Sequence, residues 1–385
     1  MSKAIKVFKT TALALVILIC CGVIGLCSVF AVTQSSRDAR IALIEYGDTD
    51  LSAKNVILMI GDGMGVNHIA TAKTDRGVDS LYMESLALRQ GQVETFSFSD
   101  NVTDSAAAGT ALSCGVKVTN GRIAYSMGAN ITNMTEFAAS LNKATGVIAT
   151  ETPTGATPAS FTAHAKDRGL TDEIANCQIT GNVDVIMGAG KEYFDGKKDL
   201  MSANGVAYYN SLDVVRNESG EGRYIACFDQ IDTGTGTDAA PTLAELCLAA
   251  IDSLEKRSDE NGFFLMIEAS HIDKESHSND FDGMVDQLMA FDRAVKAVVE
   301  WAAADGDTVV MVTADHETGK LQNDPNPGDD SFKSGQHTAN NVYYFMYCKQ
   351  DETLPDVIDN TQICMFLRNV MENNAALTGA LPQAA

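Results

Sequence analysis

The chain contains 385 residues, 45% of them hydrophobic and 21% charged, and its 51 acidic residues against 28 basic residues give a formal net charge of −23. This length suits one large α/β domain or two ordinary domains, and the normal apolar fraction argues against a disordered chain. The acidity excludes nucleic acid as a specific partner, because binding to the phosphate backbone requires clustered lysine and arginine. Any other anionic ligand would need a local positive charge, such as that of bound metal ions, to overcome the negative charge of the protein.

Residues 1–35 have the pattern of an export segment. Three lysines precede an uncharged apolar run over residues 11–32. The run is long enough to cross a ~30 Å hydrocarbon core, while Val29 and Ala31 fit the small-residue rule for signal-peptide cleavage. We therefore expect a cleaved signal peptide or a retained membrane anchor, with the rest of the chain secreted, periplasmic or on the cell surface. The six cysteines beyond it permit disulfide bonds, of which we expect at most one or two.

Beyond this segment, β-branched apolar runs alternate with helical patterns, which indicates an α/β fold. The expected elements are strands at 55–60, 145–150, 183–187, 263–267, 308–313 and 342–347, short strands near 207–209 and 223–227, and long helices at 242–257 and 283–303. Residues 195–240 are rich in Gly, Asn and Asp and are interpreted as a loop-rich insertion. No linker divides the chain, so we expect residues 36–385 to form a single domain. We predict a three-layer sandwich with a largely parallel central sheet flanked by helices.

Carboxylates follow three of these strands. Asp62 comes after the first strand, Glu268 after the fourth, and Asp315 with His316 after the fifth. A single acidic residue in such a place is most often a turn residue or a helix cap. Because the carboxyl ends of parallel strands meet at one edge, where ligands bind in open α/β sheets, three together favour a metal site at that edge.

Histidines add to this pattern. Asp273 and His277 stand four residues apart, so on a helix both side chains lie on one face, and His337 comes from a later loop. Alone, the first pair would be a surface pair or a helix cap. Mixed histidine and aspartate ligands without cysteine suit zinc in an open, catalytic site. Two such ions ~4 Å apart could clamp the attacking and leaving oxygens of an in-line displacement.

A candidate nucleophile stands at the start of an alanine-rich helical segment. Ser105 follows Asp104, and both residue types are common at helix N-termini. There a serine faces free backbone N–H groups and the positive end of the helix dipole, which stabilise an alkoxide or a phosphoryl oxygen. The alternative is an ordinary cap. No G-x-S-x-G motif is present, so activation by zinc is favoured over activation by a histidine base.

The chain resembles the alkaline phosphatase family, as a minimal bacterial-type member, from residue 55 to about 347. Six motifs in the family's order carry the resemblance. They are Ile60-Gly61-Asp62-Gly63-Met64-Gly65, Thr103-Asp104-Ser105-Ala106-Ala107, Ala156-Thr157-Pro158-Ala159, Ile272-Asp273-Lys274 with His277, Thr313-Ala314-Asp315-His316 and Gly335-Gln336-His337-Thr338. The resemblance implies a metal-dependent hydrolase of small phosphomonoesters, homodimeric, that releases phosphate through a phosphoserine intermediate with two zinc ions and one magnesium ion.

The resemblance also implies a role for each matched residue. Ser105 would be the nucleophile, Arg168 would clamp two phosphoryl oxygens, and Lys274 would reach phosphate through water. The implied ligands are Asp273, His277 and His337 for one zinc ion, Asp62, Asp315 and His316 for the other, and Asp62, Thr157 and Glu268 for magnesium.

The chain departs from the family pattern in two places. Gly155 stands where bacterial relatives often carry aspartate and animal ones histidine, which leaves the occupant of the third metal site open; His271 is a partial substitute or a surface residue. His316 and His337 are only 21 residues apart, where larger relatives carry extensive insertions. This spacing indicates an open site, and we expect broad acceptance of small phosphomonoesters.

Two other functions compete with this one. A phosphodiesterase or sulfatase of the same superfamily is the first, but sulfatases need a C/S-x-P-x-R context that Ser105 lacks, and the phosphodiesterases usually carry threonine as nucleophile. A non-catalytic, metal-stabilised surface binding protein is the second. It is the least favoured, because every implied ligand position, Ser105 and Arg168 are present.

Overall fold

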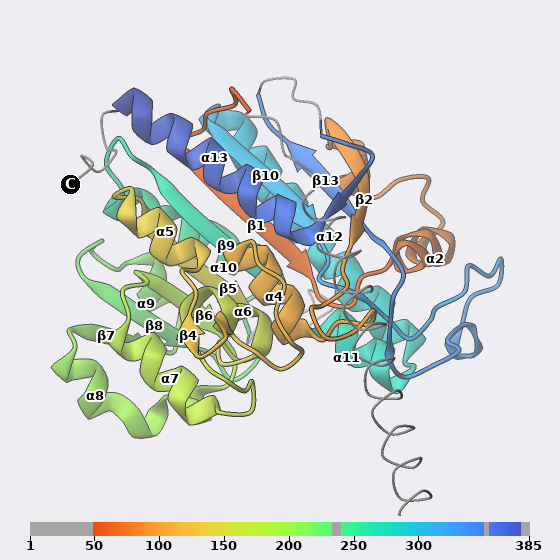
Figure 1. Ribbon diagram of the computed structural model, residues 1–385, viewed down its shortest axis with the longest axis horizontal. Helices are drawn as coiled ribbons and strands as arrows, with labels where there is room; N and C mark the ends of the chain where they lie inside the picture. The colour runs from red at the N-terminus through yellow and green to blue at the C-terminus, as the bar shows by residue number, and fades with distance from the viewer. Residues whose placement is uncertain (1–48, 233–239, 350–353, 379–385) are drawn as a thin grey trace, which may run out of the picture. The chain divides into compact units, whose positions relative to one another are not determined.

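The computed structural model of the chain describes residues 49–232, 240–349 and 354–378 (Figure 1). The strands of its main sheet are β1 (Asn55–Gly61), β2 (Arg89–Glu94), β5 (Ala144–Ala149), β6 (Val185–Gly188), β7 (Val206–Tyr209), β8 (Arg223–Cys227), β9 (Phe263–Ala269), β10 (Thr308–Thr313), β13 (Val342–Tyr347) and β14 (Val357–Asp359). Two short ribbons pair β3 (Tyr125–Ser126) with β4 (Ala129–Asn130), and β11 (Glu317–Thr318) with β12 (His337–Thr338).

The helices fall into two layers. Their bounds are α2 (Val66–Arg76), α3 (Tyr82–Ser85), α4 (Ser105–Cys114), α5 (Met134–Ser140), α6 (Ala156–Thr162), α7 (Thr171–Thr180), α8 (Lys198–Ala203), α9 (Leu212–Arg216), α10 (Leu243–Arg257), α11 (His271–Ser278), α12 (Phe281–Asp305) and α13 (Asn360–Thr378). Helices α4, α5, α6 and α13 pack on one another in front of the sheet in Figure 1, while α10 and α12 pack together on the sheet from the other side. This is the three-layer α/β sandwich that the sequence predicts.

The described sheet has ten strands in the order β14-β2-β13-β10-β1-β9-β5-β6-β8-β7. Within it β13 alone runs antiparallel to its neighbours, so the prediction of a largely parallel sheet is confirmed. The central strands are buried along their whole length, as the continuous apolar runs of strands covered on both faces require. In the register, Ile60 of β1 lies beside Glu268 of β9 and Thr313 of β10, so three carboxyl ends meet at one edge.

Some elements were not apparent from the sequence. Strand β2 has the polar sequence RQGQVE, in which Val93 alone is buried, so pairing with β13 and β14 defines it rather than its own hydrophobic pattern. The short strands expected between residues 195 and 240 are present as β7 and β8, and both pair within the main sheet. Helices α8 and α9 occupy the same stretch, which is more regular than its composition indicates.

Helix α4 is the element that carries Ser105 into the interior. Asp104 caps it, since its carboxylate accepts a hydrogen bond from the Ala107 N–H at 2.9 Å. All ten residues of α4 are buried, and Gly109 lets α6 approach closely: a Cβ there would lie 3.2 Å from the Cα atom of Thr157. The close packing of α4 on α6 therefore brings Thr157 beside the helix that begins with Ser105.

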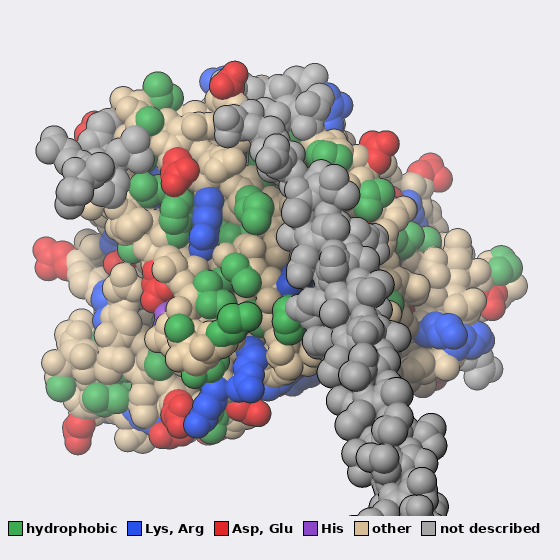
Figure 2. All heavy atoms as spheres, viewed as in Figure 1, with side chains coloured by type: hydrophobic (Ala, Val, Ile, Leu, Met, Phe, Trp, Pro, Cys, Tyr) green, Lys and Arg blue, Asp and Glu red, His purple; other side chains and the backbone are tan. Residues whose placement is uncertain are grey.

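No helix in the part of the chain that the structure describes is long and apolar enough to cross a membrane. The predicted export segment at residues 1–35 lies outside the described residues. The six cysteines beyond it are described, and no two of them form a disulfide bond. On the face shown in Figure 2, acidic and basic side chains are interspersed rather than gathered into separate patches.

Candidate metal centre

The structure brings the residues after β1 and β10 together into a first buried group. Asp62, Asp315 and His316 offer ligand atoms that all lie within 4.8 Å of one another. The Nε2 atom of His316 is 3.6 Å from Oδ1 of Asp62 and 3.2 Å from Oδ2 of Asp315. Both carboxylate oxygens are buried and accept no hydrogen bond from any described residue. A buried oxygen without a donor is costly, so this group fits a bound cation.

A second group lies beside the first and contains Asp273, His316 and His337, again with ligand atoms within 4.8 Å. His277, one turn after Asp273 on α11, adjoins it: its Nε2 is 3.2 Å from Oδ2 of Asp273 and 3.1 Å from Nε2 of His337. The rings of His316 and His337 stack with centroids 3.6 Å apart. His316 thus lies between the two groups, whereas the sequence placed it in one set only.

The oxygen-rich third set also lies at this edge. Thr157 is buried on α6, and its hydroxyl has no hydrogen-bond partner among the described residues. Glu268 is buried at the end of β9 and accepts a hydrogen bond from the Ser270 hydroxyl at 2.5 Å. Together with Asp62 these residues offer only carboxylate and hydroxyl oxygens, which are the ligands that Mg²⁺ prefers.

Three carboxyl groups of the centre, those of Asp62, Glu268 and Asp315, resist ionisation in the absence of a cation. Burial, followed by the charge of Asp273, raises the pKa of Asp315 to about 8, and burial raises the pKa of Glu268 to about 7. Burial and the charge of Asp315 likewise raise the pKa of Asp62 well above its ordinary value. The hydrogen bond to Asp273 raises the pKa of His277 to about 9. Carboxylates that repel one another in a dry site are the arrangement that bound cations stabilise.

The nucleophile candidate contacts this centre directly. Ser105 is the first residue of α4, is buried, and has its Oγ atom 3.2 Å from Nε2 of His316. Its hydroxyl therefore lies at the histidine that the two groups share. The backbone carbonyl of Thr103, two residues earlier, is 3.0 Å from Nδ1 of His337, which ties the loop before α4 to the second group.

Two cations line the exposed side of the centre, and each is paired with a carboxylate. Arg168 donates through Nη1 to Oδ2 of Asp104 at 3.3 Å, and Lys274 donates through Nζ to Glu151. Both cationic side chains are more than 40% exposed, so they lie within reach of an anion from solution. The Asp104 carboxylate thus caps α4 and orients Arg168 at the same time.

Glu151 and Thr318 are two residues that the sequence did not identify. Glu151 comes just after the end of β5, so the rule that singled out Asp62 and Asp315 could have found it. Its carboxylate accepts a hydrogen bond from the side chain of Lys274. His271 is directed elsewhere, with Nδ1 3.3 Å from the Thr150 hydroxyl. No comparable sequence pattern identifies Thr318, because its role depends on contacts with residues that are distant from it in the sequence.

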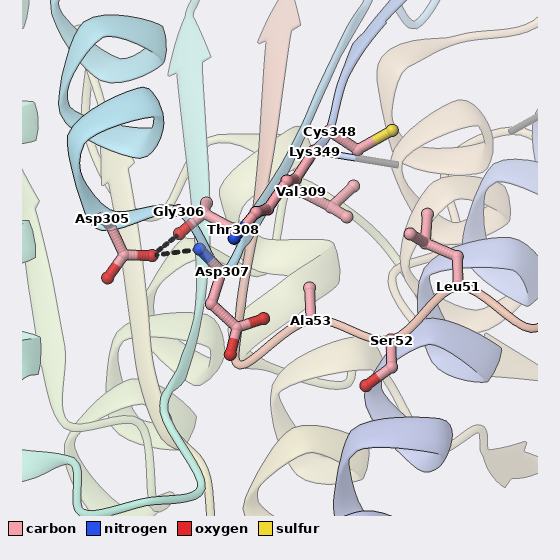
Figure 3. A pocket seen from close by; sticks show the side chains of 10 residues that line it. All are labelled: Leu51, Ser52, Ala53, Asp305, Gly306, Asp307, Thr308, Val309, Cys348 and Lys349. Carbon is pink, nitrogen blue, oxygen red and sulfur yellow. Dashed lines mark hydrogen bonds between the residues drawn. The ribbon is translucent and has the colours of Figure 1, made fainter. Parts of the chain in front are cut away.

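The opposite edge of the sheet has a different character. A pocket of about 600 Å³ opens there, at the amino ends of β1 and β10 (Figure 3). Its lining includes Asp305, whose carboxylate accepts hydrogen bonds from the Thr308 hydroxyl at 2.6 Å and the Asp307 N–H at 3.1 Å. These bonds close the α12–β10 turn. Its carboxylate is therefore explained by local structure, in contrast to those at the carboxyl edge.

Comparisons with known proteins point to one family. The family model described as alkaline phosphatase matches residues 53–226 and 229–330. The chain is 35% identical over 290 residues to alkaline phosphatase 3 of Bacillus subtilis strain 168, which covers 69% of this chain and 61% of that protein. It is also 29% identical over 335 residues to the alkaline phosphatase of Escherichia coli K12, which covers 70% of this chain and 71% of that protein.

The fold is similar to that of the alkaline phosphatase from the Antarctic bacterium TAB5. The TM-score is 0.71 at 30% identity, over 84% of this chain and 99% of that chain. The chain spans about three fifths of the length of the first curated relatives it matches, 61% and 62% for the two from Bacillus subtilis. The family match, the curated relatives and the shared fold lead to one conclusion: this chain belongs to the alkaline phosphatase family.

Proposed function

We propose that the chain hydrolyses small phosphomonoesters through a phosphoserine intermediate on Ser105. The observation that carries the proposal is the position of the Ser105 hydroxyl at His316, where two potential metal-binding groups meet. A nucleophile, two cation sites and two exposed basic side chains are the parts that in-line phosphoryl transfer requires. The family membership of the chain supports the same activity.

The residues of the chain have separate tasks in this reaction. The Ser105 oxygen forms a bond to phosphorus while the bond to the departing alcohol breaks, and water then releases phosphate from the serine. The N-terminus of α4 directs backbone N–H groups at the phosphoryl oxygens, and Arg168, held by Asp104, binds two of them. When bound, the metal ions would lower the pKa of the Ser105 hydroxyl and compensate the charge on the leaving oxygen.

We propose zinc for the two histidine-containing groups and magnesium for the oxygen-only set. Histidine and aspartate together suit zinc, while Asp62, Thr157 and Glu268 offer the hard oxygens that suit magnesium. A variant of the TAB5 enzyme is described with Mg bound in its M3 site, which supports a magnesium site in the family. Three divalent cations would outweigh the four nearby carboxylates, so an acidic protein would present a locally positive site to an anion.

Phosphomonoesters are expected to react faster than related esters. A monoester offers three non-bridging oxygens to the cations and Arg168, whereas a diester replaces one by an alkoxy group and a sulfate ester carries less charge. We expect kcat/KM for nitrophenyl phosphate to exceed that for bis-nitrophenyl phosphate and nitrophenyl sulfate at least about tenfold, which corresponds to ~1.4 kcal/mol of transition-state stabilisation. A faster diester would instead identify a phosphodiesterase.

The Lys274–Glu151 pair is expected to act as a unit in phosphate binding. Replacing Lys274 by alanine removes a cation from the rim, so the inhibition constant for inorganic phosphate should rise. Glu151→Gln should change it by less than about fivefold, since the pair is partly exposed, and should add nothing in the Lys274→Ala background. The matched control is Glu275→Gln, which removes an equal charge one residue along α11. If the double variant instead shows the product of the two single-variant changes in the inhibition constant, Glu151 and Lys274 act independently and the coupling is contradicted.

We further propose that the chain is exported and forms a homodimer. The lysine-rich start and the apolar run at residues 11–32 support export, either with cleavage or with retention as a membrane anchor. The family resemblance supports the dimer. N-terminal sequencing of the mature protein tests the first proposal, and light scattering on the purified protein tests the second.

A further inference from the structure

Thr318 contacts every member of the second group. It ends the short strand β11 and is fully buried. Its hydroxyl donates to Oδ1 of Asp273 and lies 3.3 Å from Nδ1 of His316, while its backbone pairs with His337 of β12. One side chain thus touches the carboxylate and one imidazole of the group, and its backbone lies beside the other imidazole.

The backbone of Thr318 also joins the loop that follows Asp62. Its N–H donates to the Gly63 carbonyl at 3.1 Å, and the Gly63 N–H donates to Oδ1 of Asp315 at 3.1 Å. Gly63 has φ +73°, and a Cβ there would lie 2.9 Å from the Thr318 hydroxyl and 2.8 Å from the Cα atom of Asp273. Only glycine allows this close approach, which connects Thr318 to the first group as well.

The direction of these hydrogen bonds determines which nitrogen of His316 is free. An ionised carboxylate only accepts hydrogen bonds, so the Thr318 hydroxyl proton is directed at Asp273. The hydroxyl oxygen then faces Nδ1 of His316 as an acceptor, which favours the tautomer protonated at Nδ1. The unprotonated Nε2 consequently faces Asp62, Asp315 and Ser105. This is the nitrogen that a metal in either group would use.

We infer that Thr318 is a positioning residue for both candidate zinc groups, fixing the carboxylate of Asp273 and the tautomer of His316 through a single hydroxyl. The inference rests on the proposed function, since it concerns the same centre. A neighbouring threonine shows the contrast. Thr313 is equally buried but donates its hydroxyl to the backbone carbonyl of Tyr343, which is a purely structural use. Partners that orient metal ligands typically change metal affinity 10–100-fold when they are removed.

The test compares Thr318→Val, which keeps the shape but removes the hydroxyl, with Thr318→Ser, which keeps the hydroxyl. Zinc affinity of the full chain is measured by competition with a chromophoric chelator, and bound zinc by elemental analysis. We expect Thr318→Val to bind zinc about 10–100-fold more weakly and Thr318→Ser to restore most of that affinity. The control is Thr338→Val in the same ribbon, whose hydroxyl donates to Glu317, and its zinc affinity should be unchanged.

The rise in Tm on adding zinc to each chelated variant separates a metal effect from a folding effect. A smaller rise in Thr318→Val than in the wild type supports the inference, even if the chelated variant is itself less stable. Wild-type zinc affinity in Thr318→Val, or failure of Thr318→Ser to restore it, would overturn the inference while leaving the proposed function intact. A wild-type protein that binds no zinc would overturn the proposed function and this inference with it.

Discussion

Ser105→Ala is expected to lower kcat/KM for a phosphomonoester at least about a thousandfold, because the variant lacks the oxygen that attacks phosphorus. Zinc content should stay near that of the wild type, since Ser105 belongs to neither ligand group and only its hydroxyl contacts His316. Steady-state kinetics beside elemental analysis gives both quantities. Mass spectrometry of acid-quenched wild-type protein should locate the phosphoryl group on Ser105.

The matched control for this variant is Ser113→Ala. Ser113 lies on the same buried helix, α4, and its hydroxyl bonds to the Thr110 carbonyl one turn earlier. It should keep nearly full activity. Hydrolysis by Ser105→Ala at the wild-type rate would refute the assigned nucleophile, and a comparable loss in Ser113→Ala would attribute the effect to helix packing.

Chelation of the metals is expected to abolish hydrolysis, and zinc with magnesium should restore it. Without cations, buried oxygens of Asp62 and Asp315 have no partner among the described residues. The metal ions would also no longer offset the negative charge on the attacking Ser105 oxygen and on the phosphoryl group. The chelated protein should also unfold at a lower temperature, because a ligand that binds only the folded state stabilises it. Activity that survives exhaustive chelation would refute the metal-dependent mechanism.

The stability of the chelated protein should fall as the pH rises from 7 to 9. Burial raises the pKa of Asp315 to about 8 and that of Glu268 to about 7, above the values near 4 expected in the unfolded chain. The folded state therefore holds protons that the unfolded chain has released, so the free energy of unfolding decreases with rising pH through this range. His277 acts in the same direction, since its pKa is raised to about 9 and its stabilising charge is lost as the pH passes that value.

Bound cations replace these protons, so the metal-loaded protein should lack this decrease. The gap in Tm between loaded and chelated protein is therefore expected to widen from pH 7 to pH 9, measured by scanning calorimetry at each pH. A gap that stays constant across the range would contradict the assigned carboxylates.

The sequence by itself determined the central strands, the helix start at Ser105 and the identity of the acidic residues at the strand ends. These features depend on local patterns: apolar runs, a capping aspartate and carboxylates that follow strands. The register of the folded sheet places Glu268 beside Ile60. Local pattern is thus sufficient where each residue's role follows from its own strand or helix.

Only the tertiary structure decided how these residues combine. Ser105 and His316 are 211 positions apart, and the His316–His337 stack depends on the β11–β12 ribbon returning the chain to the centre. The Lys274–Glu151 pair and the contacts of Thr318 likewise join separate elements. Strand β2 follows the same rule, because its polar sequence becomes a strand only by pairing. The reason is physical: hydrogen-bond partners and shared ligands are set by distances in space, and residue spacing along the chain does not encode those distances.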